Sequence, residues 1–372
     1  METESSRLPN LPPAGASRRY LSLLVGSLSL ITLACVTLLL PVPYVVLSPS
    51  PAFNTLGEFA GKPMITFPKD VKTYPATGAI DFTTVAVTRP EARVTLVDAI
   101  AAYFEPGREV VRRRAIYPEG ESAETSEKVT RLLFTSAQYS ARVAAVRAAG
   151  YKVPIVPVVR EVTKGYPAEG QLKRGDVLVR IDGKTMRSSL DAFTAIAMKK
   201  PGDRIAVTYK RGAALHTVKL KAAANPEDRK RARIGITMAT PKLPFKVDFH
   251  TGSKIGGSSA GAMFALGIYD RLTPGSLTGG AHVAGTGTIE LDGSIGPIGG
   301  VRQKAVGAAR NGATIFLVPA RNCADAALDV DRQGRLHGMR LVRIDTLDSA
   351  IRSLHALAKD PKANVPQCES PH

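Results

Sequence analysis

Residues 256–261 read Gly-Gly-Ser-Ser-Ala-Gly, and residues 299–304 read Gly-Gly-Val-Arg-Gln-Lys. Each segment begins with a glycine pair and continues into apolar residues at helical spacing. The first helical pattern follows Ser259 and runs until Pro274 stops it. The second runs to an Asn-Gly pair ending at Gly312, which is typical of a helix C-terminus. We therefore predict that each segment holds its reactive side chain at the start of a helix.

The residue types in these two segments suit a nucleophile and its base. A serine at a helix start lies near unpaired backbone N–H groups, which can hold a developing oxyanion. Lys304 stands one turn into the second helix, where the positive end of the helix dipole disfavours its ammonium form. Burial would lower its pKa further and make it a usable base. We therefore predict a serine nucleophile that is activated by a neutral lysine.

Three ordered motifs resemble the proteolytic domain of Lon-type serine–lysine peptidases. They are Gly-Ser-Ser-Ala-Gly at 257–261, Gly-Thr-Ile-Glu-Leu-Asp-Gly at 287–293 and Gly-Pro-Ile-Gly-Gly-Val-Arg-Gln-Lys at 296–304. The resemblance implies that Ser259 is the nucleophile, that Lys304 is the general base and that the Thr286 hydroxyl orients the lysine. Nearly the whole chain resembles the membrane-anchored, PDZ-containing Lon-like proteases of the YlbL type. The resemblance also implies a ring-shaped homo-oligomer, a hexamer by analogy with the family.

The sequence offers two alternatives to this dyad. Ser258 competes with Ser259, but the family's motif places the reactive serine immediately before Ala-Gly. A Ser-His-Asp triad is the other alternative, because two histidines and two aspartates lie in the same region. These residues are His250, His282, Asp248 and Asp292. Neither histidine falls in a recognisable catalytic motif, which favours the serine–lysine pair.

The composition is that of an ordinary globular protein with a basic surface. The 372 residues suffice for two or three domains, and 44% of them are hydrophobic. The formal net charge is +18, but no aromatic stacking motif, zinc-finger spacing or recognition helix accompanies it, so no nucleic-acid partner is expected. Basic runs such as residues 112–114 are assigned to solvated surface or to contacts with anionic lipid or envelope polymer. No cysteine or histidine cluster has metal-ligand spacing, so neither metal nor cofactor is expected.

An uncharged apolar segment, Leu21–Leu40, is long enough to cross a membrane, because its 20 residues at about 1.5 Å each span about 30 Å. Three arginines precede it, whereas no Lys or Arg follows until Lys62. The positive-inside rule therefore puts residues 1–19 in the cytoplasm, a single transmembrane helix at 20–41 and the remaining chain outside the cell membrane. A cleaved signal peptide is the alternative, but its apolar region would be shorter, and the Pro-Val-Pro that follows gives no Ala-x-Ala cleavage site.

Residues 42–125 are interpreted as a stalk and a small extracytoplasmic mixed subdomain. The closely spaced prolines of residues 42–50 favour an extended conformation. Residues 79–87 are rich in β-branched and aromatic side chains and predict a strand, and Leu96–Phe104 predicts a short helix. A long amphipathic helix is expected at 125–148.

Residues 170–183 resemble the core signature of PDZ domains. The likeness implies a PDZ-like, β-rich domain that, with the helix before it, occupies residues 126–238. Such a domain binds an extended peptide at a sheet edge. Tyr151 and Val153 stand at the place of the family's carboxylate-binding loop, which makes them candidate peptide contacts.

Gly183-Lys184-Thr185 resembles the end of a phosphate-binding loop. The position that needs the first glycine of that motif holds Leu178, so the match fails. A hairpin turn explains the three residues instead. We therefore expect no use of ATP.

Residues 239–358 alternate strand-like and helix-like segments, which predicts an α/β sandwich. Strands are expected at Val247–His250, Thr286–Leu291, Thr314–Val318 and Arg340–Val342, and helices from Ala320 and at Leu347–Leu357. Residues 359–372 are a polar tail. Cys323 and Cys368 are the two cysteines outside the apolar segment, and in an oxidising compartment we expect them to form a disulfide that pins this tail to the helix near Ala320.

The prediction is an α/β multidomain protein with an N-terminal transmembrane helix, a small mixed subdomain, a PDZ-like domain and a C-terminal Lon-type proteolytic domain. We expect a membrane-tethered, ATP-independent serine endopeptidase that cleaves extracytoplasmic or envelope proteins presented by the PDZ-like domain. The alternative is a non-catalytic PDZ scaffold of the cell envelope. The presence of both Ser259 and Lys304 in their motifs favours the enzyme.

Overall fold

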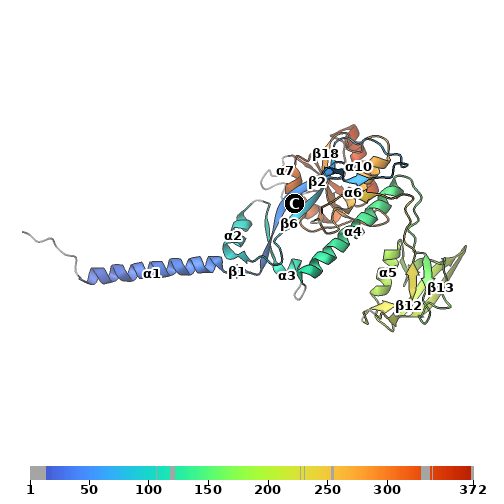
Figure 1. Ribbon diagram of the computed structural model, residues 1–372, viewed down its shortest axis with the longest axis horizontal. Coiled ribbons are helices and arrows are strands. Elements are labelled where there is room, and N and C mark those ends of the chain that lie inside the picture. Colours follow the sequence, from blue (N-terminus) through green and yellow to red (C-terminus); the bar gives the residue numbers. More distant parts are fainter. Residues whose placement is uncertain are drawn as a thin grey trace, which may run out of the picture. The chain divides into compact units, whose positions relative to one another are not determined.

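The structure is a computed structural model of the chain (Figure 1). It describes residues 14–369 apart from 106, 118–121, 227, 230, 253–254, 328–335 and 337. The chain divides into two compact units. The smaller unit contains the residues up to Ser48 and residues 86–123, and the larger unit contains residues 49–85 and everything from Glu124 onward.

The smaller unit begins with the long helix α1 (Ala14–Leu39). Its segment Tyr20–Leu39 has a mean hydropathy of 2.2, is exposed, and is long and apolar enough to cross a membrane. After α1, strand β1 (Pro41–Val42) pairs antiparallel with β7 (Val94–Thr95). The predicted helix α2 (Leu96–Phe104) follows β7 with the expected bounds. Its start is fixed by a capping box, in which the Thr95 hydroxyl accepts from the backbone N–H of Asp98 and the Asp98 carboxylate accepts from that of Thr95.

The rest of the smaller unit is a short antiparallel pair. The first half of β2 (Tyr44–Asn54) pairs with β8 (Glu109–Arg112), and β8 leads into α3 (Arg113–Ile116). The interpretation of residues 42–50 as a stalk is therefore wrong. Prolines favour extended backbone, but only distant partner strands decide whether that backbone stands alone or joins a sheet.

The larger unit is built around a parallel sheet. Its four parallel strands are β6 (Ala79–Val87), β18 (His282–Gly285), β21 (Ile315–Pro319) and β22 (Arg340–Ile344). Their order in space is β22-β21-β18-β6. Residues 49–85 thus belong to the same unit as the proteolytic segment, and 42–125 is not one separate subdomain. The strand at 79–87 was expected, but its partner lies about 200 residues away in sequence, and local periodicity does not show such a partner.

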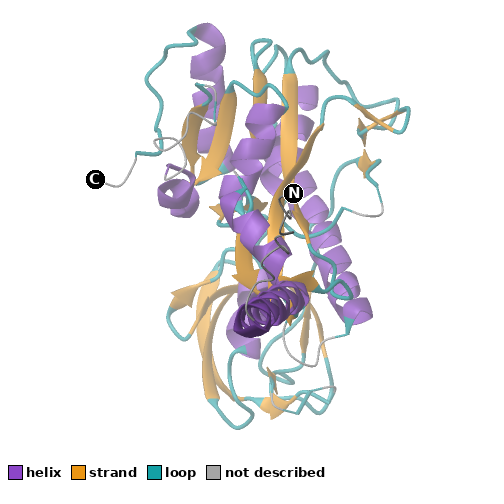
Figure 2. Cartoon of the chain, turned by 90° about the vertical axis from the view of Figure 1, so that its left-hand side faces the viewer, coloured by secondary structure: helices purple, strands orange, loops and turns teal. Residues whose placement is uncertain are grey.

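Helices cover both faces of this sheet (Figure 2). Successive side chains of each strand point to opposite faces. Val283 and Leu317 lie in one buried cluster with residues of α4, α6 and α10, whereas Ala284 and Phe316 lie in another with residues of α7 and α8. The helices are α4 (Ala123–Ala148), α6 (Gly261–Leu272), α7 (Val301–Arg310), α8 (Cys323–Ala327), which the 3-10 turn η1 (Ala320–Asn322) precedes, and α10 (Leu347–Lys359). The predicted α/β sandwich is confirmed.

One predicted strand of the sandwich is wrong. Thr286–Leu291 was expected to be continuous, but β18 ends at Gly285, and β19 (Thr288–Ile289) starts a separate antiparallel pair with β20 (Ile295–Gly296). Gly287 causes the break, because its φ is 153° and a Cβ there would lie 2.7 Å from a methyl carbon of Ile295. Thr286 is therefore at the carboxyl end of a central strand.

Residues 159–238 form a β-rich part with its own core. Strands β11, β10, β12 and β13 form one sheet in that order, β9 pairs with β16, β14 pairs with β15, and α5 (Ser189–Ala197) follows β11. Their bounds are β9 (Val159–Val162), β10 (Val177–Ile181), β11 (Lys184–Thr185), β12 (Arg204–Arg211), β13 (Ala214–Lys221), β14 (Ala223–Ala224), β15 (Ala232–Arg233) and β16 (Ile236–Met238). Lys184 pairs with Ile181 across the turn, so the hairpin expected at residues 183–185 is present.

Two further short antiparallel pairs belong to the larger unit. Strand β3 pairs with β4, and β5 pairs with β17. Their bounds are β3 (Glu58–Phe59), β4 (Lys62–Pro63), β5 (Ile65–Thr66) and β17 (Asp248–Phe249).

The described part of the tail packs along β22. The backbone N–H of Cys368 donates to the Leu341 carbonyl at 3.1 Å, and that of Arg343 donates to the Pro366 carbonyl at 2.9 Å. A disulfide joins Cys323 at the start of α8 to Cys368. Residues 361–369 are therefore not a free polar tail. Strand β22 lies at the edge of the sheet, and the tail forms hydrogen bonds with its exposed backbone groups.

The disulfide predicts a stability difference. Replacing Cys368 with serine should lower the free energy of unfolding by about 2–4 kcal/mol, because the cross-link closes a 45-residue loop and restricts the unfolded chain. Urea unfolding of the purified full-length protein in detergent measures this difference. Cys35→Ser is the matched control, because that cysteine is free and exposed on α1. A midpoint that neither Cys368→Ser nor a reductant lowers would contradict the prediction.

Candidate active site

Ser259 lies immediately before the start of α6. The helix begins at Gly261, with Ala260 as its N-cap residue, and Ser259 is half-buried. Gly261 allows the helix start to approach β19 closely, since a Cβ there would lie 2.8 Å from a methyl carbon of Ile289. The serine side chain is thus held at a helix N-terminus, as the sequence indicates.

The Ser259 segment is tied to the end of β18. The Ser259 carbonyl accepts two hydrogen bonds, from the backbone N–H of Gly287 at 2.8 Å and from the hydroxyl of Thr286 at 3.1 Å. In return, the N–H of Ala262 donates to the Gly287 carbonyl at 3.0 Å. These bonds fix the start of α6 against the carboxyl end of a central strand.

Lys304 approaches the same place from α7. Its side chain is only 3% exposed. The Nζ atom donates a hydrogen bond to Thr286 Oγ1 at 3.0 Å. The hydrogen bonds of the described residues therefore link all three predicted site residues through Thr286, which accepts from Lys304 Nζ and donates to the carbonyl, not the hydroxyl, of Ser259.

The environment of Lys304 changes its acidity. Burial disfavours the charged ammonium and lowers the pKa of Lys304 from 10.5 to about 7. No carboxylate forms an ion pair with Lys304 among the described residues, so nothing opposes this effect. Lys304 can therefore be a neutral amine with a free lone pair at a pH far below the usual pKa of lysine. Such an amine can remove a proton from a hydroxyl group.

A third strand supports the site. Thr83 on β6 is buried and its hydroxyl donates to the Gly285 carbonyl at 3.0 Å, directly before Thr286. Sequence reasoning missed this residue. The β-branched pattern of residues 79–87 predicts the strand but gives no sign that it lies beside β18.

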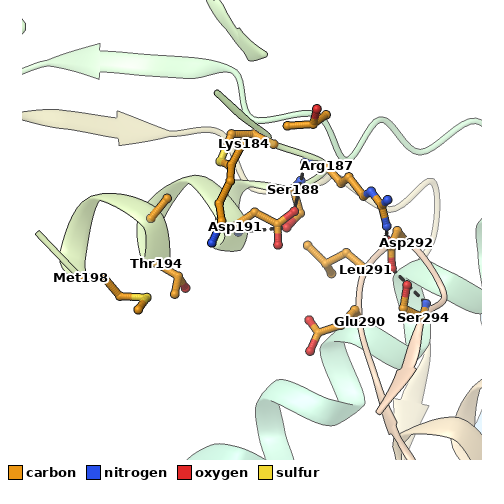
Figure 3. Close-up of a pocket in the computed structure, with 13 residues that line it drawn as sticks. Lys184, Arg187, Ser188, Asp191, Thr194, Met198, Glu290, Leu291, Asp292 and Ser294 are labelled. Atoms are coloured by element: carbon orange, nitrogen blue, oxygen red, sulfur yellow. Dashed lines mark hydrogen bonds and ion pairs between the residues drawn. The ribbon is translucent and has the colours of Figure 1, made fainter. Parts of the chain in front are cut away.

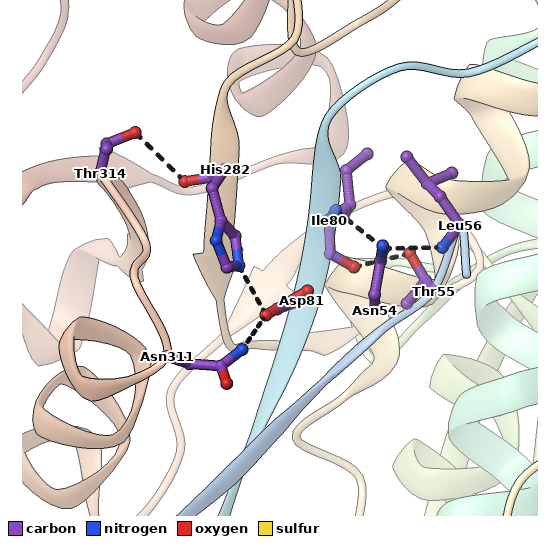
Figure 4. Close-up of polar contacts among 8 residues, drawn as sticks. All are labelled: Asn54, Thr55, Leu56, Ile80, Asp81, His282, Asn311 and Thr314. Carbon is purple, nitrogen blue, oxygen red and sulfur yellow. Dashed lines mark hydrogen bonds and ion pairs between the residues drawn. The ribbon is translucent and has the colours of Figure 1, made fainter. Parts of the chain in front are cut away.

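The two histidines of the alternative triad have other partners. His250 Nδ1 contacts the Pro63 carbonyl at 3.0 Å. His282 Nε2 contacts the buried carboxylate of Asp81 at 2.8 Å, and Asn311 donates to the same carboxylate oxygen (Figure 4). Among the described residues, no hydrogen bond joins the Ser259 hydroxyl to either imidazole or to the Lys304 amine, but only Lys304 is linked to Ser259 through Thr286.

Of the two candidate peptide contacts, Val153 is a core residue, whereas Tyr151 is 37% exposed. Val153 is 4% exposed and lies in the buried cluster that contains α6 and α10, so its side chain is not available to a peptide. The ring of Tyr151 packs edge-on against Phe245, with 5.1 Å between ring centroids. Both residues connect the long helix α4 to the sandwich core rather than to the β-rich part.

A separate cavity of about 650 Å³ lies away from the three site residues (Figure 3). Side chains of β11 and α5 line it together with Glu290–Asp292 and Ser294, which belong to the turn between β19 and β20. Burial, and then the nearby Asp292 and Asp191 carboxylates, raise the pKa of Glu290. None of Ser259, Thr286 and Lys304 lines this cavity, so it is not the place of the predicted chemistry.

Comparisons with known families agree with these two regions. The family described as the Lon protease (S16) C-terminal proteolytic domain matches residues 246–357, and the PDZ domain family matches residues 133–222. The PDZ domain of the SdrC-like protein from Listeria monocytogenes is a similar solved structure. It has 31% identity over 22% of this chain and 86% of its own, with a TM-score of 0.21.

Lon proteases from several bacteria are similar to this chain. The Lon protease of Phenylobacterium zucineum is 30% identical over 163 residues, which is 42% of this chain and 20% of that protein. Lon protease 2 of Herpetosiphon aurantiacus is 40% identical over 85 residues, which is 22% of this chain and 10% of that protein. The match thus spans a fifth or less of the length of these two relatives.

The PDZ match overlaps most of the β-rich part, and the Lon match lies within the α/β sandwich. An N-terminal apolar helix precedes both. The chain therefore contains a PDZ domain and a C-terminal proteolytic domain of the Lon type.

Proposed function

We propose that the protein is a membrane-tethered serine endopeptidase with a Ser259–Lys304 dyad, which works without ATP on extracytoplasmic proteins. The observation that carries the proposal is the buried Lys304 amine, with a pKa of about 7, hydrogen-bonded to Thr286, which in turn bonds the backbone of Ser259. Burying a lysine without a carboxylate partner is costly, and such a cost is expected where a neutral amine is needed.

The reaction follows from these positions. Neutral Lys304 removes the proton from Ser259 Oγ as that oxygen attacks the peptide carbonyl carbon. The resulting oxyanion lies at the start of α6, where the positive end of the helix dipole favours negative charge. The lysine ammonium then gives its proton to the leaving amine, and an acyl-enzyme ester remains. A water molecule, deprotonated by the same lysine, hydrolyses the ester and restores the serine.

Thr286 holds the base in place. A neutral amine has two N–H groups and one lone pair, and the bond from Lys304 Nζ to Thr286 Oγ1 uses one N–H. The lone pair is left free to accept a proton from Ser259. Because the nucleophile and its base often make long contacts before substrate binds, the missing hydrogen bond between the two side chains is compatible with this role.

Independence from ATP and attachment to a membrane complete the proposal. The only near match to a phosphate-binding loop is a β-hairpin turn at residues 183–185, not a strand–loop–helix. The segment Tyr20–Leu39 of α1 is long and apolar enough to span a bilayer, and three arginines precede that segment. The disulfide between Cys323 and Cys368 supports an oxidising compartment for the proteolytic domain. Assembly into a hexamer remains an expectation from the family resemblance.

The second candidate function is a PDZ scaffold without catalysis, which the PDZ match favours. A scaffold needs no neutral lysine beside a serine. The two functions therefore differ in whether purified protein turns over a substrate.

The dyad predicts a specific pattern of activity losses. Ser259→Ala and Lys304→Ala should each lower kcat/KM by about a thousandfold or more, and the double variant should lose little beyond that, because the pair acts as one unit. Lys304→Arg should fail equally, since a guanidinium group does not deprotonate. Thr286→Ala should be milder. Hydrolysis of an unfolded, fluorescently labelled protein by the full-length enzyme in detergent measures these rates.

Ser258→Ala is the matched control, because it removes a neighbouring hydroxyl and should retain most of the parent activity. Substantial turnover by folded Lys304→Ala protein would reject the serine–lysine mechanism. A parent protein that is inactive on every unfolded substrate and that does not react with a boronate at Ser259 would favour the scaffold.

The lowered pKa of Lys304 predicts two dependences on pH. Activity should rise as the pH increases through about 7, because the neutral amine is the base. Stability should rise as well. The pKa of Lys304 is lower in the folded state than its unfolded value of 10.5. Above about pH 10.5 the lysine therefore does not reduce the free energy of unfolding. Below that pH the free energy of unfolding falls by about 1.4 kcal/mol for each pH unit, down to about pH 7.

Lys304→Met should remove this loss. Its unfolding midpoint in urea should exceed that of the parent by a margin that grows as the pH falls from 9.5 to 7. Lys242→Met changes an exposed lysine and serves as the control, with no such trend. A constant difference between Lys304→Met and the parent across this range would contradict the buried, neutral lysine.

The PDZ domain predicts a separable effect on substrates. The backbone N–H of Ala239 donates to the Val158 carbonyl at 2.8 Å, so residues 159–238 can be excised between two adjacent ends. Helix α4 must stay, because Ala141 and Val143 are fully buried in the core that also contains α6. If the excised part recruits substrate, the variant should show a raised KM for a protein substrate and an unchanged kcat/KM for a short peptide. Equal losses on both substrates would show that the excised part supports the fold instead.

A further inference from the structure

Helix α2 of the smaller unit buries its small side chains and exposes its large apolar ones. The side chains that it buries are the small Ala99 and Ala102. Its large apolar side chains are exposed, with Tyr103 at 75% and Phe104 at 76% of their full accessibility. Val97 and Ile100 are also exposed, at 41% and 43%. A soluble helix normally buries its large apolar face, so an exposed one at helical spacing marks a surface that meets something apolar.

The position of α2 indicates what that partner is. The backbone N–H of Leu96, the first residue of α2, donates to the carbonyl of Leu40 at 3.0 Å, directly after the apolar helix α1 ends. The β1–β7 pair joins Pro41 to Thr95 and Val42 to Val94. Helix α2 is therefore fixed within one residue of the end of the candidate membrane span.

The direction of α2 fits a membrane surface. In Figure 1, α1 runs horizontally and α2 rises across its right-hand end, on the side of the smaller unit from which α1 leaves. A helix that crosses the end of a membrane span lies along the bilayer surface rather than through it. Its length of nine residues is also too short to span the hydrocarbon layer.

We propose that α2 is an interfacial helix that inserts its exposed apolar face into the outer leaflet of a phospholipid bilayer. Val97, Ile100 and Phe104 enter the acyl region, and Tyr103 lies at the headgroup level, where amphipathic rings are favoured. The proposal rests on the membrane attachment of α1 proposed above. It adds a second, independent contact with the same membrane.

The charges around α2 agree with a bilayer surface. Arg112 and Arg114 are exposed next to the β2–β8 pair, and the backbone N–H of Arg113 donates to the Pro43 carbonyl, just after the end of α1. Arginines at this level can meet anionic lipid headgroups. The capping carboxylate of Asp98 is turned to the helix start, where it bonds the N–H and hydroxyl of Thr95.

The absence of tryptophan from the sequence allows a direct test. Phe104→Trp places a single indole on the exposed face of α2 with little change in size. The full-length variant is reconstituted into vesicles of phosphatidylcholine and phosphatidylglycerol, with bromine atoms at a shallow or a deep position of the acyl chains. We expect stronger quenching by the shallow bromines than by the deep ones, together with protection from iodide in the water.

Two single-tryptophan variants separate the possible outcomes. Leu33→Trp lies within the candidate membrane span of α1 and should be quenched better by the deep bromines than Phe104→Trp is. Leu215→Trp lies on exposed β13 and serves as the reference that iodide quenches. If Leu33→Trp is not quenched by lipid bromines, the membrane attachment itself fails.

If Leu33→Trp is quenched but Phe104→Trp is not, only the interfacial helix is rejected. Iodide quenching of Phe104→Trp would show a water-exposed face, and protection from both quenchers would show that a second protein copy covers it; either result overturns the proposal. As a further check, adding Ile100→Glu to Phe104→Trp should reduce the quenching by shallow bromines, because a buried carboxylate weakens insertion.

Discussion

The hydrogen bond from the buried Lys304 amine to Thr286 depends on contacts between segments that are far apart in the sequence. Thr286 has its position because β18 ends at Gly285, between β6 and β21. Lys304 has its position because α7 packs against the face of the sheet that carries Ala284 and Phe316. The burial that this packing produces also lowers the pKa of Lys304.

The central sheet gathers segments from both ends of the chain. Strand β6 comes from residues 79–87, far before the segments that contain Ser259 and Lys304. The Thr83 hydroxyl on this strand donates to the carbonyl of Gly285, the last residue of β18. Helix α4 then contributes Ala141 and Val143 to the core and hydrogen-bonds the sandwich through Arg142. The proteolytic domain that residues 246–357 identify is therefore incomplete as a folding unit without these earlier segments.

This sharing of segments explains how the other parts are attached. The β-rich part has its own core, and its two ends lie side by side, because the backbone N–H of Ala239 donates to the Val158 carbonyl. The smaller unit in turn is built from residues before and after residues 49–85, with the apolar helix at its start. Two exposed apolar elements, α1 and α2, lie next to each other in that unit.

The sequence by itself determined the local features: the apolar span, the helix at Leu96–Phe104, the hairpin at residues 183–185 and the starts of α6 and α7. Periodicity, capping residues and glycine pairs act over a few residues, so they can be recognised from the sequence alone. Only the tertiary structure decided that residues 44–54 are a strand rather than a stalk, that Val153 is buried and that the chain end pairs with β22. It also decided that Lys304 is buried beside Thr286, because burial and the partners of a strand depend on contacts between residues far apart in the sequence, which no local pattern encodes.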